Sequence, residues 1–577
     1  MRRRTFAPLM LLAALVCTAC VSLPTEGGVR VTEQNTQATP EAGFPYNPRP
    51  PQPGETPAEI VRHFLDAMTA NPISTAVARQ FLSAPAREGW RPNDAMITYA
   101  DLTTPLGGST VEVNLLGAHR LDSRGAWQGK LNEEQSRLDF SMVLEDGEWR
   151  INTLPNAMIV TDSWFADRYT QASLFFFDPT GTILVPEPVF VPRGDQLATA
   201  LVSGLLRGPV APRSDVSQSF IPRELQVEFS IPVPQDGLAE VALTGDVPNF
   251  DNDTLELMTA QIAWTLRQDP SIERFRVTLN GNPITGSGTR SDVDTSIGEP
   301  FDPAVRDSWL APFALLKGRM ISLNASGEQP LDGPFGRRSY GLRSMGLDLN
   351  AELVAGIADD GRTALLAPAE GDGEPQVVLS RASNLLKPAW DHVGALWLLD
   401  AAPSGAVVRV VVGGKVREVQ VPGVTGEQVV DFVVSRDGSR LVAIVAGRGS
   451  DRVVVSRLAR RGSQVRGVNP RVVWSEPGEK LDLRALAWRT PTEVLVARAI
   501  AGDLTQVTRR SVDGSAGLSS GDVSSELVRD RVTALVSSPL SGSPAWAVGA
   551  QGQAHLVASR EDGFVPAPEL RALTYVG

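Results

Sequence analysis

Apolar residues change their spacing along the chain, and the first regular spacing begins after residue 55. Residues 56–59 (TPAE) have the composition of a capping box, with proline at the first helical position. The apolar residues that follow share one helical face: Ile60, Val61, Phe64, Leu65 and Met68. A second helical stretch is expected over 75–82, and alternating strands follow, with a hairpin turn at Asp146-Gly147. We therefore predict an α+β block over residues 56–170.

A second α+β block is predicted over residues 171–311, which include a linker. The stretch SLFFFDPTGTILVPEPVFVP reads as two strands joined by a turn at Asp178-Pro179. A helix is expected over 196–207, capped by Asp195, and another over 254–268, capped by Asp253. Strands are expected in LQVEFSIPV, LAEVALTG and RFRVTLNGNP.

From residue 312 to 577 the pattern is almost entirely that of β-strands. Apolar doublets separated by turns recur at roughly 35 to 55 residues with about four strands per unit, which is typical of a β-propeller. We predict five or six blades. Asp360-Gly361 and Asp437-Gly438 are expected at equivalent hairpin turns, and Ala389-Trp390 and Ala487-Trp488 at equivalent strand ends. The hairpin in residues 315–331 is expected to supply outer strands that close the ring.

The two cysteines of the chain, Cys17 and Cys20, lie in an N-terminal segment that has the features of an export signal. Three arginines precede an apolar run that is too short to span a bilayer. A redox pair or half of a zinc site lacks the surrounding elements that either needs. The sequence Thr18-Ala19-Cys20 resembles a lipoprotein cleavage signal, and an ordinary cleaved signal peptide is the alternative. We expect a signal peptide over 1–19, lipidation of Cys20 and a proline-rich tether over 20–55.

Composition favours a globular protein, and the lipoprotein signal predicts that it is anchored on the extracytoplasmic face of the cell membrane. The formal charge of −12 argues against nucleic acid as a main partner. We predict no metal, because the four histidines are far apart and show no ligand spacing: His63, His119, His392 and His555. We also expect no cofactor. The string GLSSG at 517–521 matches a serine-hydrolase elbow but lies in a polar loop, so we expect no enzyme.

One stretch, residues 447–471, is basic on an otherwise acidic protein. It contains seven arginines and only one acidic residue, Asp451; the arginines are Arg448, Arg452, Arg457, Arg460, Arg461, Arg466 and Arg471. They form a possible docking patch for an acidic partner or an anionic lipid. An ordinary solvated strand and loop would give the same pattern.

Three resemblances give these blocks a family context. The first block, ending in GEWRINTLPNAMIVTDSWF, resembles NTF2-like domains, and the second, with LATALVSGLLRGP and MTAQIAWTLRQDPSIERFRVTLNGNPI, resembles GerMN domains. The order of the segments resembles that of the LpqB lipoproteins of actinobacteria: a lipoprotein cleavage signal, a proline-rich tether, an NTF2-like block, a GerMN-like block and a propeller. That resemblance implies binding to the extracytoplasmic part of an MtrB-like sensor histidine kinase, which modulates the MtrAB system controlling cell-wall and division functions. An envelope hydrolase or a peptidoglycan- or glycan-binding module is the alternative.

Overall fold

The computed structural model describes residues 45–209, 215–233, 236–246, 250–284, 291–305, 308–324, 327–476, 478–515, 525–558 and 565–577. The predicted signal peptide, Cys17, Cys20, most of the predicted tether and the 517–521 string lie outside these residues. The chain from Phe44 to Gly577 forms one compact unit. Within its described residues, no helix is long and apolar enough to cross a membrane.

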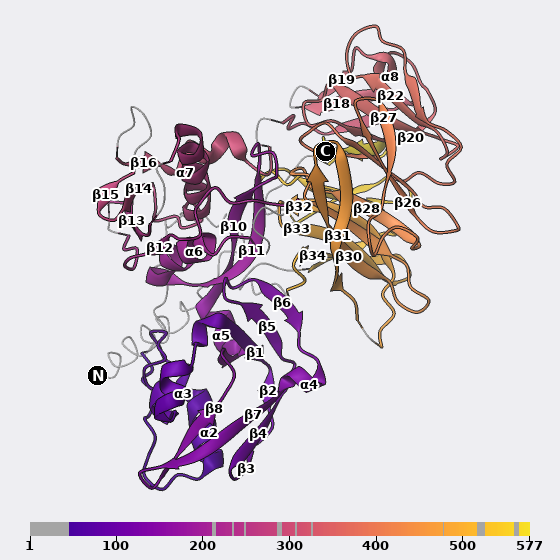
Figure 1. Cartoon of the computed structure of the whole chain (residues 1–577). Helices are drawn as coiled ribbons and strands as arrows, with labels where there is room; N and C mark the ends of the chain where they lie inside the picture. Colours follow the sequence, from indigo (N-terminus) through magenta and orange to yellow (C-terminus); the bar gives the residue numbers. More distant parts are fainter. Residues whose placement is uncertain are drawn as a thin grey trace, which may run out of the picture. The chain divides into compact units, whose positions relative to one another are not determined.

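The N-terminal block is α+β, as predicted (Figure 1). The capping box is confirmed, because the Thr56 side chain accepts from the Glu59 amide, and the predicted apolar face of α2 is buried. The predicted second helical stretch is shorter than expected, because within 75–82 only Ala78–Phe81 is helical, as a 3-10 helix, and an unpredicted helix, α3, follows it. The helical elements are α2 (Pro57–Ala67), η1 (Ala78–Phe81), η2 (Pro92–Asp94), α3 (Ala84–Gly89), α4 (Glu133–Ser136) and α5 (Asp162–Arg168).

Two sheets complete this block, in the orders β6-β5-β1-β9 and β2-β4-β7-β8. The predicted hairpin between β7 and β8 is confirmed, with positive φ at both Asp146 and Gly147, as a type I′ turn requires. The strands are β1 (Ala95–Tyr99), β2 (Asp101–Leu102), β3 (Leu106–Gly107), β4 (Thr110–Leu116), β5 (His119–Asp122), β6 (Trp127–Lys130), β7 (Arg137–Glu145), β8 (Glu148–Thr153) and β9 (Met158–Thr161).

The middle block begins with the long hairpin of β10 (Tyr169–Phe177) and β11 (Leu184–Pro192), against which helices α6 (Leu197–Leu206) and α7 (Asn252–Leu266) pack (Figure 1). Both predicted caps are wrong. Asp195 lies in a 3-10 turn, η3 (Gly194–Gln196), and Asp251 caps α7 because the helix already includes Asn252. The second sheet joins β12 (Gln226–Val227), β13 (Leu238–Thr244), β14 (Arg274–Leu279), β15 (Asn282–Pro283) and β16 (Val293–Asp294), and η4 (Thr295–Phe301) follows.

The described part of the C-terminal block contains six antiparallel sheets, which are the blades of the propeller. In chain order their strands are β17 (Phe313–Leu316), β18 (Arg319–Asn324), β19 (Gly327–Pro330), β20 (Leu342–Leu347), β21 (Leu353–Ala358), β22 (Ala364–Pro368), β23 (Gln376–Leu379), β24 (Ala389–Trp390), β25 (Leu396–Asp400), β26 (Val407–Val412), β27 (Lys415–Val419), β28 (Val429–Val434), β29 (Arg440–Val445), β30 (Arg452–Arg461), β31 (Gln464–Trp474), β32 (Leu483–Thr490), β33 (Glu493–Ala501), β34 (Leu504–Ser511), β35 (Ser525–Arg529), β36 (Val532–Val536), β37 (Ala545–Gly549), β38 (Ala554–Val557) and β39 (Leu570–Thr574). A short helix, α8 (Pro334–Arg337), follows β19.

The last strand, β39, closes the ring. It pairs with β17 in the order β19-β18-β17-β39 and also contacts β20, the first strand of the second blade. The early hairpin therefore supplies outer strands of blade 1, as predicted, and closure leaves the inner strands without an open edge.

The predicted equivalence of the two Asp-Gly turns is wrong. Asp360-Gly361 joins the second and third strands of blade 2, whereas Asp437-Gly438 joins the first and second strands of blade 4. The same dipeptide suits either turn because its conformation, not its place in a blade, selects it. The Ala-Trp pairs do occupy equivalent places, at the ends of the first strands of blades 3 and 5.

Candidate functional site

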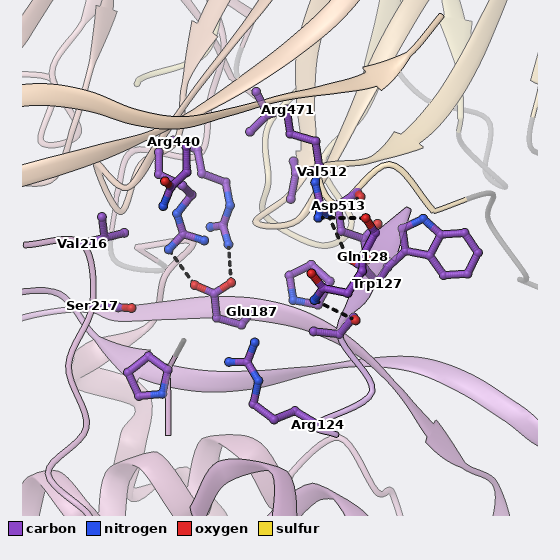
Figure 2. A pocket seen from close by; sticks show the side chains of 16 residues that line it. Arg124, Trp127, Gln128, Glu187, Val216, Ser217, Arg440, Arg471, Val512 and Asp513 are labelled. Carbon is purple, nitrogen blue, oxygen red and sulfur yellow. Dashed lines mark hydrogen bonds and ion pairs between the residues drawn. The ribbon is translucent and has the colours of Figure 1, made fainter. Parts of the chain in front are cut away.

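One end of the propeller, where the first and second strands of each blade are joined, contacts the other two blocks. Blade 4 contributes arginines from β29, β30 and β31, and blade 5 contributes the residues after β34. Facing them are β6 of the N-terminal block and β11 of the middle block. We call the region where these elements meet the junction. It encloses a cavity of about 280 Å³, shown in Figure 2.

Glu187 is the central carboxylate of this junction. It lies on β11, and its Oε1 is 2.6 Å from Arg457 Nη2 while its Oε2 is 3.6 Å from Arg440 Nη2 (Figure 2). Arg440 also donates to the carbonyl of Pro186 and to Ser439 Oγ. The Arg440 side chain is 2% exposed and that of Glu187 is 23% exposed, so this ion pair is largely removed from water. Charge pairs of this kind fix geometry strongly, because an unpaired member would stay buried.

The protonation states follow from burial and from the neighbouring charges. Burial disfavours the ionised form of Glu187, but the charges of Arg457 and Arg440 outweigh it and hold the pKa of Glu187 below its ordinary value. Burial, followed by the repulsion of Arg457, lowers the pKa of Arg440 to about 10. Glu187 is therefore a carboxylate at neutral pH, the opposite of the raised pKa that a general acid needs.

Arg471 and Gln171 join further parts of the same junction. Arg471 Nη1 donates to the carbonyls of Trp127, at 2.8 Å, and Asp513, at 3.0 Å (Figure 2). Gln171, on β10, donates to Ser511 Oγ at 3.0 Å. Arg471 thereby links β6 of the N-terminal block to blades 4 and 5 through neutral carbonyl oxygens. These hydrogen bonds hold β6 and β10 against blades 4 and 5.

Another arginine, Arg436, connects the linker that follows η4 to the ring of the propeller. It follows β28 and donates to Ala304 O and Ser308 Oγ, each at 2.8 Å, to Ser538 Oγ at 3.3 Å and to Val576 O at 3.0 Å. Arg436 is 4% exposed, and burial lowers its pKa to about 10 against the opposing charge of Asp302. The linker, blade 4, blade 6 and the C-terminal strand thus share one buried guanidinium, which we call the Arg436 hub.

The structure places the seven arginines of the predicted docking patch in different environments. Arg457 and Arg471 belong to the junction, and Arg460 pairs with the buried Asp391 at 2.6 Å. Arg461 and Arg466 are mostly exposed and share Asp215 of the middle block, at 3.0 and 3.3 Å. Arg452 pairs with Glu427 at 2.9 Å, and Arg448 is exposed. Most of this basic stretch therefore contacts the chain itself; docking of another molecule there stays a prediction.

Sequence reasoning missed Glu187, Arg436 and Arg440. Glu187 had a detectable signal, because it is the one charge in the apolar run from residue 183 to 191, and a lone carboxylate in a buried strand needs a cation. Arg436 and Arg440 flank an ordinary turn and gave no such signal. No group of three or more His, Cys, Asp or Glu side chains in the described residues is arranged to hold a metal ion.

Three family descriptions match successive parts of the chain. Residues 50–166 match "Lipoprotein LpqB, N-terminal domain", residues 173–285 match "Sporulation and spore germination", and residues 318–541 match "Lipoprotein LpqB beta-propeller domain".

Relatives that match over most of the chain carry the name lipoprotein LpqB. The chain is 29% identical to lipoprotein LpqB of Rhodococcus opacus, over 89% of this chain and 88% of the relative. It is 26% identical to that of Mycobacterium bovis, over 99% and 98%, and 25% identical to that of Cutibacterium acnes, over 96% and 95%.

Solved structures also resemble parts of the chain. The first GerMN domain of the sporulation protein GerM from Bacillus subtilis is 20% identical, with a TM-score of 0.18, and covers 22% of this chain and 97% of that one. A nidogen/laminin complex is 14% identical, with a TM-score of 0.33, and covers 46% and 97%.

Proposed function

The chain belongs to the LpqB family of lipoproteins, and from this premise we propose that it is a binding protein, anchored at Cys20 to the extracytoplasmic face of the membrane. Its proposed partner is the extracytoplasmic domain of an MtrB-like sensor histidine kinase, and its proposed action is non-catalytic. The family descriptions and the relatives' names support the lipoprotein assignment. The kinase partner rests on the resemblance in block order.

The observation that carries this proposal is the junction between the propeller and the other two blocks. Glu187, held by Arg440 and Arg457, and the Arg436 hub fix the middle block and the linker to one end of the ring. Because separating a buried ion pair leaves its members unpaired, these contacts favour one relative arrangement of the blocks. The junction also leaves other surfaces of the propeller in contact with solvent, including Arg448 and Arg461.

The mechanism follows from differential binding. A lipoprotein that binds one conformation of a receptor more tightly than another shifts the population of the receptor toward the first. The size of that shift equals the difference between the two binding free energies, and a rigid ligand retains more of that difference. No bond is made or broken in this mechanism, and the ionised state of Glu187 is consistent with a structural rather than an acid role.

The test reconstitutes the full-length lipoprotein and the full-length kinase together in liposomes. We expect crosslinks between propeller residues and the extracytoplasmic domain of the kinase, together with a change in the rate of kinase autophosphorylation. Deletion of the propeller is a poor test because it would expose Glu187 and the linker, so the intact chain is used. Absence of both crosslinks and a rate change at saturating lipoprotein would contradict the proposal. Release of reducing sugars from peptidoglycan would instead support an envelope hydrolase.

A further inference from the structure

A groove lies on the outer side of the propeller between blades 3 and 4. Its walls come from β27 and from the hairpin of β30 and β31, and it encloses about 480 Å³. The floor is apolar and buried, with Val419 at 2% and Ala459 at 3% exposure. The Gly467 amide donates to the carbonyl of Gln420 at 2.8 Å, which fixes the two outer strands against each other. The groove is therefore a built feature of the ring.

The rim of this groove is basic. Arg417, Arg461 and Arg466 line it, and the side chains of Arg461 and Arg466 are 82% and 66% exposed. Arg417 is oriented by hydrogen bonds from its Nη1 to the carbonyl and the hydroxyl of Ser463, at 2.8 and 2.7 Å. Three guanidinium groups around an apolar floor are unusual on a protein with a formal charge of −12. Such a rim attracts carboxylates and repels cations.

A carboxylate of the chain itself already uses part of this rim. Asp215, from the middle block, places Oδ1 3.0 Å from Arg461 Nη2 and Oδ2 3.3 Å from Arg466 Nη2. Hydrogen bonds from Arg461 and Arg466 hold the pKa of Asp215 below its ordinary value. The other lining carboxylate, Glu418, is paired with Arg409 at 3.1 Å. Asp215 shows which chemistry the rim accepts, and its contacts are exposed enough to exchange with another carboxylate.

We propose that this groove binds an acidic, partly apolar segment of a partner protein, with carboxylates on Arg417, Arg461 and Arg466 and small apolar side chains over Val419 and Ala459. The inference rests on the proposed function, because it names the surface that receives the kinase domain. Asp215 competes with the incoming carboxylates for Arg461 and Arg466. Alternation of acidic and apolar side chains suits an extended segment laid along the two outer strands.

The first test measures fluorescence anisotropy with the full mature chain and a labelled peptide of alternating glutamate and valine. The double variant R417E/R461E should weaken binding by roughly five- to tenfold, the scale for reversing two exposed charges. Asp215→Asn should strengthen binding, because it frees two arginines. Arg448→Glu is the control: it reverses one exposed arginine of blade 4 outside the groove, half the charge change of the double variant, and should leave the affinity unchanged. Equal weakening by Arg448→Glu, or no binding by the unaltered chain, would overturn the inference.

Two further experiments are needed. One distinguishes an acidic peptide from an anionic lipid as the ligand of the groove, and the other distinguishes failure of the groove inference from failure of the proposed function. Vesicles containing phosphatidylglycerol should bind R417E/R461E and the unaltered chain equally; selective loss with the variant would identify a lipid site and overturn the peptide assignment. The kinase domain is then titrated with the same variants. If it binds all of them equally, the groove inference fails while the proposed function stands. If the peptide binds as expected but the kinase domain does not bind at all, the proposed function fails, and the groove remains a site for an acidic segment of a different partner.

Discussion

Replacement of Glu187 by glutamine tests the central ion pair of the junction. The change keeps the shape of the side chain but removes the charge that faces Arg457 at 2.6 Å and Arg440 at 3.6 Å. The nearest remaining carboxylate to Arg440 is that of Asp437, at 3.8 Å. Removing one member of a buried pair costs about 3–5 kcal/mol. Because Glu187 is 23% exposed and water can partly replace it, we expect about 2–3 kcal/mol.

Native-state hydrogen exchange followed by mass spectrometry measures this cost locally, which suits a multidomain chain whose unfolding is not two-state. Amides of β11 and β30 should exchange roughly 30- to 150-fold faster in Glu187→Gln. Glu418→Gln is the control, since Glu418 pairs with Arg409 at 3.1 Å but is 62% exposed, and its loss should cost less than about 1 kcal/mol. Equal effects of the two variants on β11 would refute the view that the Glu187 pair holds the junction.

Three other changes follow from the same contacts. The pKa of Glu187 is lowered in the folded chain, so its stabilising contribution is complete above the ordinary glutamate value of about 4.3 and is lost as the pH falls further; acid should speed exchange from β11 less in Glu187→Gln than in the unaltered chain. Arg436→Met leaves the Ala304 and Val576 carbonyls without their donor, so its thermal unfolding midpoint should be lower than that of the unaltered chain, with the midpoint of Arg436→Lys between the two. Equal midpoints for all three proteins would contradict a stabilising role of the Arg436 hub. Cys20→Ser should move the chain from the membrane fraction to the soluble extracytoplasmic fraction on centrifugation, and continued sedimentation with membranes would contradict lipid anchoring.

Local features of the fold could be predicted from the sequence because neighbouring residues determine them. The capping box at Thr56 and the turn at Asp146-Gly147 depend on contacts within four residues, and both are confirmed. The cap at Asp253 was wrong because Asp251 lies two residues earlier and precedes the helix instead. The cap at Asp195 was wrong because a 3-10 turn that includes Asp195 comes before the helix. The equivalence of Asp360-Gly361 was misplaced because a turn signal does not state its place in a blade.

The candidate site could not be predicted, because its partners are far apart in the chain. Arg440 contacts Glu187 across more than 250 residues, and Arg471 contacts the Trp127 carbonyl across 344. The basic stretch was visible in the sequence, but its partners were not, since a backbone carbonyl leaves no trace in composition. The lone carboxylate in the strand of Glu187 was the one usable signal on the other side of the junction.

The arginines of blade 4 differ in burial, and that difference separates a fixed contact from an exchangeable one. Arg440 is 2% exposed in its side chain, so its partner Glu187 cannot leave without stranding a buried charge. Arg461 is 82% exposed, so water or another carboxylate replaces Asp215 at little cost. Because Glu187 and Asp215 both belong to the middle block, a partner that displaces Asp215 does not detach that block while the Glu187 pair holds. Binding at the groove and rigidity at the junction are therefore compatible, as the proposed receptor binding requires.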